Sequence, residues 1–438
     1  MMESGFVAGG GLGTKSSGLV RRCSRAGTVR YSVAQPERNV TRFDTEGEIT
    51  STVEKLYDAY PFPPDPLIDE EPIGYNWRWH YPTAYSFCAK RAPETEDIRI
   101  LDAGCGTGCG TEYLVHLNKQ AEVVGIDLSS GALEVATERL SRSIGKDNAA
   151  RATLIQKSIF DARELEGDFD MINCVGVIHH TPDPLRALLA LKDKLKPGGI
   201  LHIFVYALNG RWEIQLMQKA LALLQQGEVD FKGGVELGRK VFGALPKENR
   251  LRKREESRWA AENERDATFA DMYLHPQEID YTIDTLFEMI DAAELKFIGF
   301  SNPRTFDLAR VLEDKELLNL AKSLPERDQY RLVENLDPES VTHFEFFLSK
   351  EPFDTVDWSD TQMLHNATAT ISPCIHGFPN KTIFDGDYFP MMLSDNQFEF
   401  LKSLSDCGSI GSAAKESGCE AEEIVALIHQ TIIIPTPQ

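Results

Sequence analysis

The chain has 438 residues, of which 42% are hydrophobic and 26% are charged, so a folded protein with more than one core is expected. It contains no run of about 18 apolar residues, which argues against a membrane-spanning helix. Its formal charge of −22 would repel nucleic acids and anionic membranes. Eight cysteines without a CxxC pair or a zinc-finger spacing indicate a reducing compartment and no structural metal.

The N-terminal segment differs from the rest in composition. Residues 1–42 hold seven basic and two acidic residues, are rich in glycine and serine, and have no long apolar core. This composition predicts an organelle transit peptide over residues 1–45, for a plastid rather than a mitochondrion. The alternatives are a mitochondrial transit peptide and a disordered basic tail on a cytoplasmic protein.

Residues 46–97 are expected to form a helical and aromatic cap. A short helix over 48–60 leads into a proline-rich turn at 60–66, and several aromatic residues then follow within 75–90. Together the rings could form a lid over a pocket, whereas any single ring is more simply explained by core packing.

Strands and helices alternate regularly from residue 98 onward. Such alternation predicts a parallel sheet covered on both faces by helices. The expected strands are 98–101, 121–126, 152–155, 169–175 and 199–206, and the expected helices are 110–117, 130–142 and 183–195.

Two helical insertions, 207–270 and 305–336, interrupt this alternation. Between and after them we expect a helix over 276–293 and strands over 295–300 and 344–348. The resulting domain spans residues 98–350.

The C-terminal part is expected to contain an irregular linker, 351–393, and a small helical module, 394–438. Residues 409–428 have the pattern of a helix-turn-helix, which would suit DNA reading. However, residues 386–438 contain eight acidic and two basic residues, the wrong sign for phosphate contacts. A packing or docking module is therefore favoured.

A glycine-rich turn follows the first strand, with the sequence Leu101-Asp102-Ala103-Gly104-Cys105-Gly106-Thr107-Gly108. The three glycines let the backbone turn sharply and approach a ligand at a helix N-terminus. Dinucleotide-binding enzymes also have such a turn, but here the spacing is G-x-G-x-G with an acid two residues before the first glycine. Asp127 ends the second strand, where it could accept both hydroxyls of a ribose or cap the next helix.

Four segments of the chain together resemble the class I methyltransferases that use S-adenosylmethionine (SAM): Ile98–Gly108, Val124–Ser129, Phe169–Pro184 and Leu195–Leu201. The resemblance covers residues 98–206 and is weaker over 271–350. It implies an α/β, Rossmann-like sheet of seven mostly parallel strands with helices on both faces, the last strand being antiparallel. It also implies SAM as the cofactor.

The resemblance further implies which residues contact SAM. Many relatives carry an acid after the third strand that binds the adenine amino group, but this chain has Lys157-Ser158-Ile159, so Ser158 or a backbone group must substitute. The implied contacts are Asp102, Gly104, Gly106 and Gly108 around the methionine part, Asp127 at the ribose, Leu128 and Ile159 on the two adenine faces, and Val175 at the end of the fourth strand.

A general base is needed only if the methyl acceptor must lose a proton during attack. His179 and His180 follow the fourth strand, at the edge where the methyl group should lie, although histidines of this turn are often structural. Tyr206, Tyr273 and His275 are the alternative candidates. No residue is expected to bind a metal.

The sequence therefore predicts a SAM-dependent methyltransferase whose acceptor is a small organic molecule. Residues 57–81 and the two insertions are expected to cover the site and to set substrate choice. The alternatives are a protein side chain as the acceptor, or a scaffold that binds SAM without catalysis. An NAD-dependent oxidoreductase is disfavoured by the glycine spacing and by the His-His-Thr-Pro-Asp-Pro turn. The oligomeric state stays open.

Overall fold

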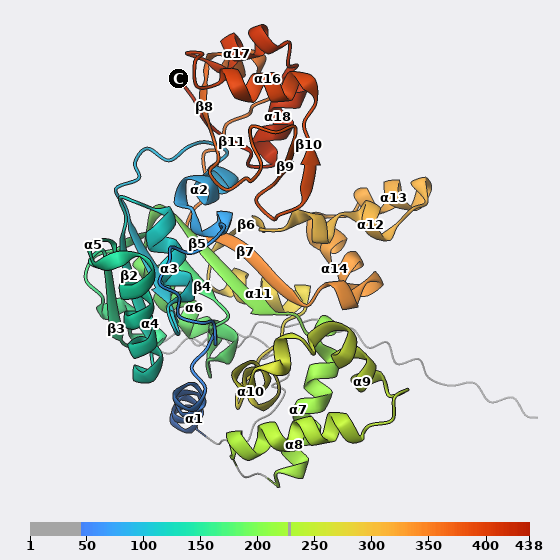
Figure 1. Ribbon diagram of the computed structural model, residues 1–438. Helices are drawn as coiled ribbons and strands as arrows, with labels where there is room; N and C mark the ends of the chain where they lie inside the picture. The colour runs from blue at the N-terminus through green and yellow to red at the C-terminus, as the bar shows by residue number, and fades with distance from the viewer. Residues whose placement is uncertain (1–44, 227–228) are drawn as a thin grey trace, which may run out of the picture. The chain divides into compact units, whose positions relative to one another are not determined.

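The central sheet of the computed structural model has seven strands in the order β3-β2-β1-β4-β5-β7-β6 (Figure 1). Neighbouring strands are parallel except that β7 runs antiparallel to both β5 and β6. The predicted Rossmann-like sheet with an antiparallel last strand is thus confirmed. The strands are β1 (Arg99–Ala103), β2 (Glu122–Asp127), β3 (Ala152–Gln156), β4 (Phe169–Val175), β5 (Leu195–Tyr206), β6 (Lys296–Phe300) and β7 (His343–Ser349).

The structure describes residues 45–226 and 229–438. The predicted transit peptide therefore lies outside the described residues, apart from Thr45.

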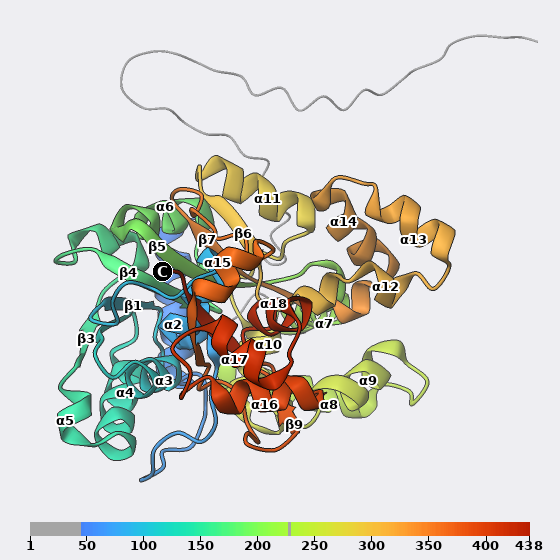
Figure 2. The ribbon, with the colours of Figure 1, turned by 90° about the horizontal axis from the view of Figure 1, so that it is seen from above.

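Helices cover both faces of the sheet because its strands are apolar on both sides. In β1, Ile100 and Leu101 are both fully buried, yet they belong to two different hydrophobic clusters. Figure 2 shows these two layers on opposite sides of the sheet. One layer contains α6 (Pro184–Lys194) and α11 (Ile283–Ala292), and the other contains α2 (Tyr81–Ala89), α3 (Cys109–Leu117) and α4 (Ser130–Ser143), followed by α5 (Gly145–Ala149).

Both predicted insertions are helical. The first forms a hydrophobic core of its own, which also takes in Leu56 of the N-terminal helix α1 (Glu46–Ala59). The second packs against α11 and the β6–β7 edge. Their helices are α7 (Trp212–Leu224), α8 (Phe231–Ala244), α9 (Arg250–Arg254) and α10 (Asp266–Leu274) in the first, and α12 (Leu308–Val311), α13 (Lys315–Lys322) and α14 (Glu326–Leu336) in the second.

The helix expected over 276–293 begins only at Ile283. Thr282 caps α11 by accepting a hydrogen bond from the Thr285 backbone N–H. The residues before the cap are extended, since the Ile279 N–H donates to the His179 carbonyl at 2.9 Å and the Tyr281 N–H to the Tyr206 carbonyl at 2.9 Å. The expectation was wrong here because apolar residues of an extended segment can imitate the first turn of a helix.

The segment expected to be an irregular linker, 351–393, instead contains regular elements. These are α15 (Thr361–Asn366), β8 (Thr368–Ile371), β9 (Thr382–Phe384) and β10 (Pro390–Met392). They share one hydrophobic core with the predicted three helices, α16 (Asp395–Ser403), α17 (Ile410–Ser417) and α18 (Ala421–His429), and with β11 (Ile433–Thr436). We call residues 354–438 the C-terminal module. Strands of three or four residues are too short to give a clear periodic signal.

Within the described ranges, none of the helices has both the length and the apolar character needed to cross a bilayer.

Gly210, at the start of the first insertion, packs closely against the backbone of Val341. A Cβ at this position would lie 1.9 Å from the Val341 carbonyl oxygen, so Gly210→Ala must force the two backbones apart. We expect the free energy of unfolding to fall by about 2 kcal/mol or more. Differential scanning fluorimetry should show this as a decrease of several degrees in Tm. Gly47→Ala, which adds a methyl group with nothing within 4 Å, is the matched control and should leave Tm unchanged or raise it. Equal effects of the two substitutions would contradict the close approach at Gly210.

Candidate active site

A cavity of about 380 Å³ lies at the carboxyl ends of β1, β2 and β4. The strand order reverses between β1 and β4, which is where open α/β sheets form their ligand crevice. Eight of the nine predicted cofactor contacts line this cavity: Asp102, Gly104, Gly106, Asp127, Leu128, Ser158, Ile159 and Val175.

Two glycines of the turn after β1 have different structural roles. At Gly106 the backbone φ is +52°, and an added Cβ would lie 2.4 Å from the Phe62 carbonyl oxygen. Gly108 has a φ of +81° but does not line the cavity, and its Cβ would lie 2.8 Å from the Cβ of Ala136. The glycine at 106 thus lets the N-terminal segment close over the turn, and the one at 108 lets α3 pack tightly on α4.

The Asp102 carboxylate is buried and faces the cavity. One oxygen accepts a hydrogen bond from the Thr111 hydroxyl at 2.6 Å, and the other accepts one from the Asn173 side-chain amide at 2.8 Å. Burial raises the pKa of Asp102, while these two donors act in the opposite direction. A buried carboxylate with spare lone pairs suits an ammonium group, such as that of the methionine part of SAM.

Asp127 is held by backbone donors. Its Oδ1 accepts from the Ser129 N–H and its Oδ2 from the Gly106 N–H, both at 2.9 Å. Burial raises the pKa of Asp127, and the backbone N–H groups oppose this rise. Each oxygen keeps a further lone pair, so the carboxylate can accept both hydroxyls of a ribose.

Ser158 occupies the position after β3 where many relatives carry an acid. Ser158 lines the cavity and caps the 3-10 turn Ile159–Glu164 by accepting from the Phe160 N–H at 3.3 Å. Its hydroxyl hydrogen remains available as a donor. Lys157 pairs with Glu164 at 2.7 Å, so its charge is compensated beside the adenine end of the predicted site.

The N-terminal cap forms one wall of the cavity through Tyr57, Phe62 and Trp79. The turn around Phe62 is fixed to the glycine loop, because the Thr107 N–H donates to the Phe62 carbonyl at 3.1 Å. Arg139, itself buried, donates to the carbonyls of both Thr107 and Asp65 at 2.9 and 2.8 Å. The expectation that residues 57–81 cover the site is confirmed.

The expectation for the two insertions was wrong. No lining residue comes from the described parts of 207–270 or from 305–336. The second insertion packs at the β6 edge of the sheet. The first packs around Leu56 of α1, next to the cavity-lining residue Tyr57.

The five predicted candidates for a catalytic base separate into two groups. His180 and Tyr206 line the cavity, whereas His179, Tyr273 and His275 do not. His179 is fully buried, and its ring centroid lies 4.1 Å from that of His180 and 4.2 Å from that of Tyr206. Tyr273 donates its hydroxyl to Glu255 and packs within the core of the first insertion.

His275 does not line the cavity but contacts residues that do. It belongs to a group of four residues that we call the histidine–tyrosine cluster: Tyr57, His180, Asp271 and His275. Burial lowers the pKa of both histidines, so their rings are neutral. The Gln277 N–H donates to Nδ1 of His275 at 3.2 Å, which leaves the ring hydrogen on Nε2, 3.2 Å from the Tyr57 oxygen. Tyr57 in turn donates to Asp271 at 3.1 Å.

His180 is oriented by the same residue of the extended segment. Its Nδ1 donates to the Gln277 carbonyl at 2.9 Å, so Nε2 carries a lone pair. The ring stacks on His275 with centroids 3.7 Å apart.

Asp271 is the member of this cluster that titrates near neutral pH. Burial raises its pKa to about 6, although the hydrogen bond from Tyr57 and the charge of Arg211 act against the rise. Burial lowers the pKa of His180 to about 3, which makes the imidazole a weak base. Sequence reasoning selected the histidines and missed both Asp271 and Tyr57.

His180, Asp271 and His275 offer ligand atoms that all lie within 4.8 Å of one another, a spacing compatible with a metal ion. A cation there would need the lone pair of His275 Nε2. The N–H of Gln277 places the ring hydrogen on that nitrogen instead. The donor pattern therefore favours a hydrogen-bond relay over a metal site.

Comparisons with known proteins show what type of domain contains this cavity. Residues 101–201 match the family profile described as a methyltransferase domain. An uncharacterized protein of Synechococcus sp. is 49% identical over 395 residues, which cover 89% of this chain and 94% of that protein. The ubiquinone biosynthesis O-methyltransferase of Vibrio parahaemolyticus is 30% identical over 155 residues, which cover 34% of this chain and 62% of that enzyme.

Among solved structures, PKMT2 from Rickettsia typhi in complex with AdoHcy has a TM-score of 0.58 at 16% identity. The match covers 83% of this chain and 77% of that chain. At this identity the likeness concerns the fold.

The Asp127 carboxylate gives a direct test of the cofactor site. Asp127→Asn removes a charged acceptor for the ribose hydroxyls, and we expect S-adenosylhomocysteine (SAH) to bind at least about tenfold more weakly by calorimetry. Asp161→Asn is the control, because Asp161 is an exposed carboxylate on the neighbouring turn and does not line the cavity. Unchanged SAH affinity in Asp127→Asn would show that the ribose binds elsewhere.

Proposed function

The chain belongs to the class I SAM-dependent methyltransferases, and we propose that it transfers the methyl group to a hydroxyl of a small organic molecule. The observation that carries this proposal is Asp271, a cavity-lining carboxylate whose pKa of about 6 allows it to accept a proton at neutral pH. The O-methyltransferase activity in the name of the Vibrio parahaemolyticus relative supports the choice of a hydroxyl.

The cluster favours an acceptor that donates hydrogen bonds. Asp271 and the Nε2 lone pair of His180 both present acceptors to the cavity. A carboxylate as the methyl acceptor would be repelled by Asp271, whereas a hydroxyl can donate to it. The same wall therefore selects the acceptor group and orients it.

The rest of the wall favours an apolar or aromatic molecule. Phe62, Trp79, Val177, Phe204 and Tyr206 all line the cavity. Apolar lining with a few placed polar groups is typical of small-molecule sites.

The residues divide the chemistry between them. SAM, when bound, supplies a sulfonium methyl group that is already activated, so that the C–O bond forms as the S–C bond breaks. Asp102 and Asp127 bind and orient the cofactor, and the cap residues exclude water. Asp271 takes the hydroxyl proton of the acceptor, and Tyr57 stabilises the carboxylate by donating to it.

Asp271 sets the expected pH dependence. The base must be ionised, so kcat/KM should rise with pH through about 6. Asp271→Asn should remove this acid limb and lower kcat/KM by about 100-fold or more, with SAH affinity unchanged. A pH–rate profile of both proteins checks this, and an unaltered profile in Asp271→Asn would show that another group is the base.

The acceptor can be identified with SAM labelled on its methyl group and fractionated extracts. The label should enter a small molecule, and mass spectrometry should place it on oxygen. Label in the protein fraction, or on carbon or nitrogen, would contradict the proposed acceptor.

We also propose that residues 1–45 direct the chain to a plastid, based on their basic, glycine- and serine-rich composition. A fusion of residues 1–45 to a fluorescent reporter should enter plastids, and a variant with all basic residues of the segment changed to serine should not. Cytoplasmic or mitochondrial fluorescence of the first fusion would contradict the proposal.

A further inference from the structure

A short turn of the N-terminal cap connects the C-terminal module to the cofactor site. It is the 3-10 turn Trp77–Trp79, whose three consecutive side chains contact three different parts of the molecule. Trp77 donates to Asp387 at 3.1 Å, and Trp79 donates to Asn173 at 3.0 Å. Arg78, between them, contacts both the module and the sheet.

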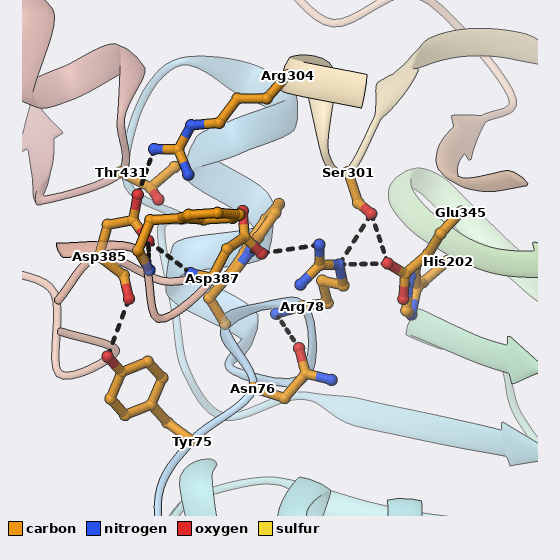
Figure 3. Close-up of polar contacts among 12 residues, drawn as sticks. Tyr75, Asn76, Arg78, His202, Ser301, Arg304, Glu345, Asp385, Asp387 and Thr431 are labelled. Atoms are coloured by element: carbon orange, nitrogen blue, oxygen red, sulfur yellow. Dashed lines mark hydrogen bonds and ion pairs between the residues drawn. The ribbon is translucent and has the colours of Figure 1, made fainter. Parts of the chain in front are cut away.

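Arg78 is the central residue of this connection. Figure 3 shows its guanidinium between Asp387 on one side and Ser301 and Glu345 on the other. The contacts measure 2.9 Å to Asp387, 2.8 Å to Ser301 and 2.6 Å to Glu345. The Arg78 side chain is only 11% exposed, so these contacts are weakly screened by solvent.

The chain of polar contacts continues through the sheet to the cofactor site. Glu345 lies 3.1 Å from Nε2 of the fully buried His202, whose Nδ1 lies 2.8 Å from the Asn173 side-chain oxygen. The Asn173 amide then donates to Asp102 at 2.8 Å. The series Asp387–Arg78–Glu345–His202–Asn173–Asp102 is therefore a continuous line of polar contacts. Burial lowers the pKa of His202, and the single ring hydrogen of the neutral imidazole makes a hydrogen bond to one of its two acceptor neighbours, Glu345 or Asn173.

The electrostatics of the middle link fit a permanent connection. Burial alone would raise the pKa of Glu345, but the Arg78 guanidinium and His202 bring it down to about 2. The carboxylate therefore stays ionised at any physiological pH and keeps Arg78 in place.

The C-terminal module is built to hold this turn closely. Gly386 lies against the Trp77 indole, and an added Cβ would approach its ring to 2.7 Å. Tyr75 stacks on Tyr388 with centroids 4.6 Å apart, and its hydroxyl donates to the Asp385 carbonyl at 2.9 Å.

We propose that the C-terminal module sets the affinity for SAM, with Arg78 as a positioning residue that acts on Asp102 through Glu345, His202 and Asn173. The series orients the amide of Asn173, and that amide fixes the Asp102 carboxylate for the ammonium group of the cofactor. The proposal rests on the predicted contact of Asp102 with SAM and is independent of the identity of the acceptor.

The test measures SAH affinity by calorimetry in the full chain. Asp387→Asn and Gly386→Ala change only the module, and each should weaken SAH binding about fivefold. Glu345→Gln should weaken it by a similar or larger factor. Lys381→Ala breaks an exposed ion pair within the same module, with Asp395, and is the control with unchanged affinity.

Non-additivity distinguishes a series from general destabilisation. The double variant Asp387→Asn/Glu345→Gln should bind SAH no more weakly than the weaker-binding single variant, because both substitutions interrupt the same series. The proposal would be overturned if the double variant lost SAH affinity by the product of the two single-variant factors. Wild-type affinity in both Asp387→Asn and Gly386→Ala would also overturn it. Tm recorded for each variant separates lost folding from lost binding.

Coupling must also act in the reverse direction. Saturating SAH should slow hydrogen exchange at backbone amides of residues 385–389 in the wild type, and less so in Glu345→Gln. If the wild type binds SAH while Asp102→Asn binds it equally well, the series ends at a residue that does not contact the cofactor, and the proposal fails.

Discussion

The Asp102 carboxylate is the group on which the rest of the site depends. It is only 3% exposed, and a buried carboxylate destabilises a fold unless donors surround it. The register of the sheet provides one of these donors, since parallel pairing of β1 and β4 sets Asp102 directly beside Asn173. Thr111 in the first turn of α3 provides the other. A shift of one residue between these strands would put Asp102 and Asn173 on opposite faces of the sheet and break their hydrogen bond.

Three aspartates line the cavity, of which Asp102 and Asp271 are buried and Asp127 is partly buried, and their surroundings differ. Asp102 and Asp127 each accept at least two hydrogen bonds, which oppose the effect of burial on their pKa. Asp271 accepts one, from Tyr57, and its pKa reaches about 6. The two aspartates with more hydrogen-bond donors are suited to hold a polar, cationic cofactor, whereas Asp271 is suited to exchange a proton. Aspartates in one cavity thus differ in their suitability for binding a cation or accepting a proton through their number of hydrogen-bond donors.

The sequence predicted the features that depend on local pattern. Each strand of the sheet was located to within four residues, because buried parallel strands are continuous apolar runs. The glycine turn and its two acids, Asp102 and Asp127, do lie at the cavity. Residues brought together by the fold were harder to find. Asp271 and His275 are four positions apart and share one side of the chain, whereas Tyr273 is two positions from either and points into the insertion core. Helical spacing could therefore have favoured Asp271 over Tyr273 as a candidate for the catalytic base. Tyr57 could not have been chosen, since α1 reaches the site through tertiary packing, with α4 and with the core of the first insertion.

A crystal structure of the protein with SAH would test the role of Asp102 most directly. The amino group of SAH should lie within about 3 Å of the Asp102 carboxylate, with the ribose hydroxyls on Asp127 and the Asn173 amide still bonded to Asp102. An amino group bound by other residues, with Asp102 retaining only Thr111 and Asn173 as partners, would contradict this role.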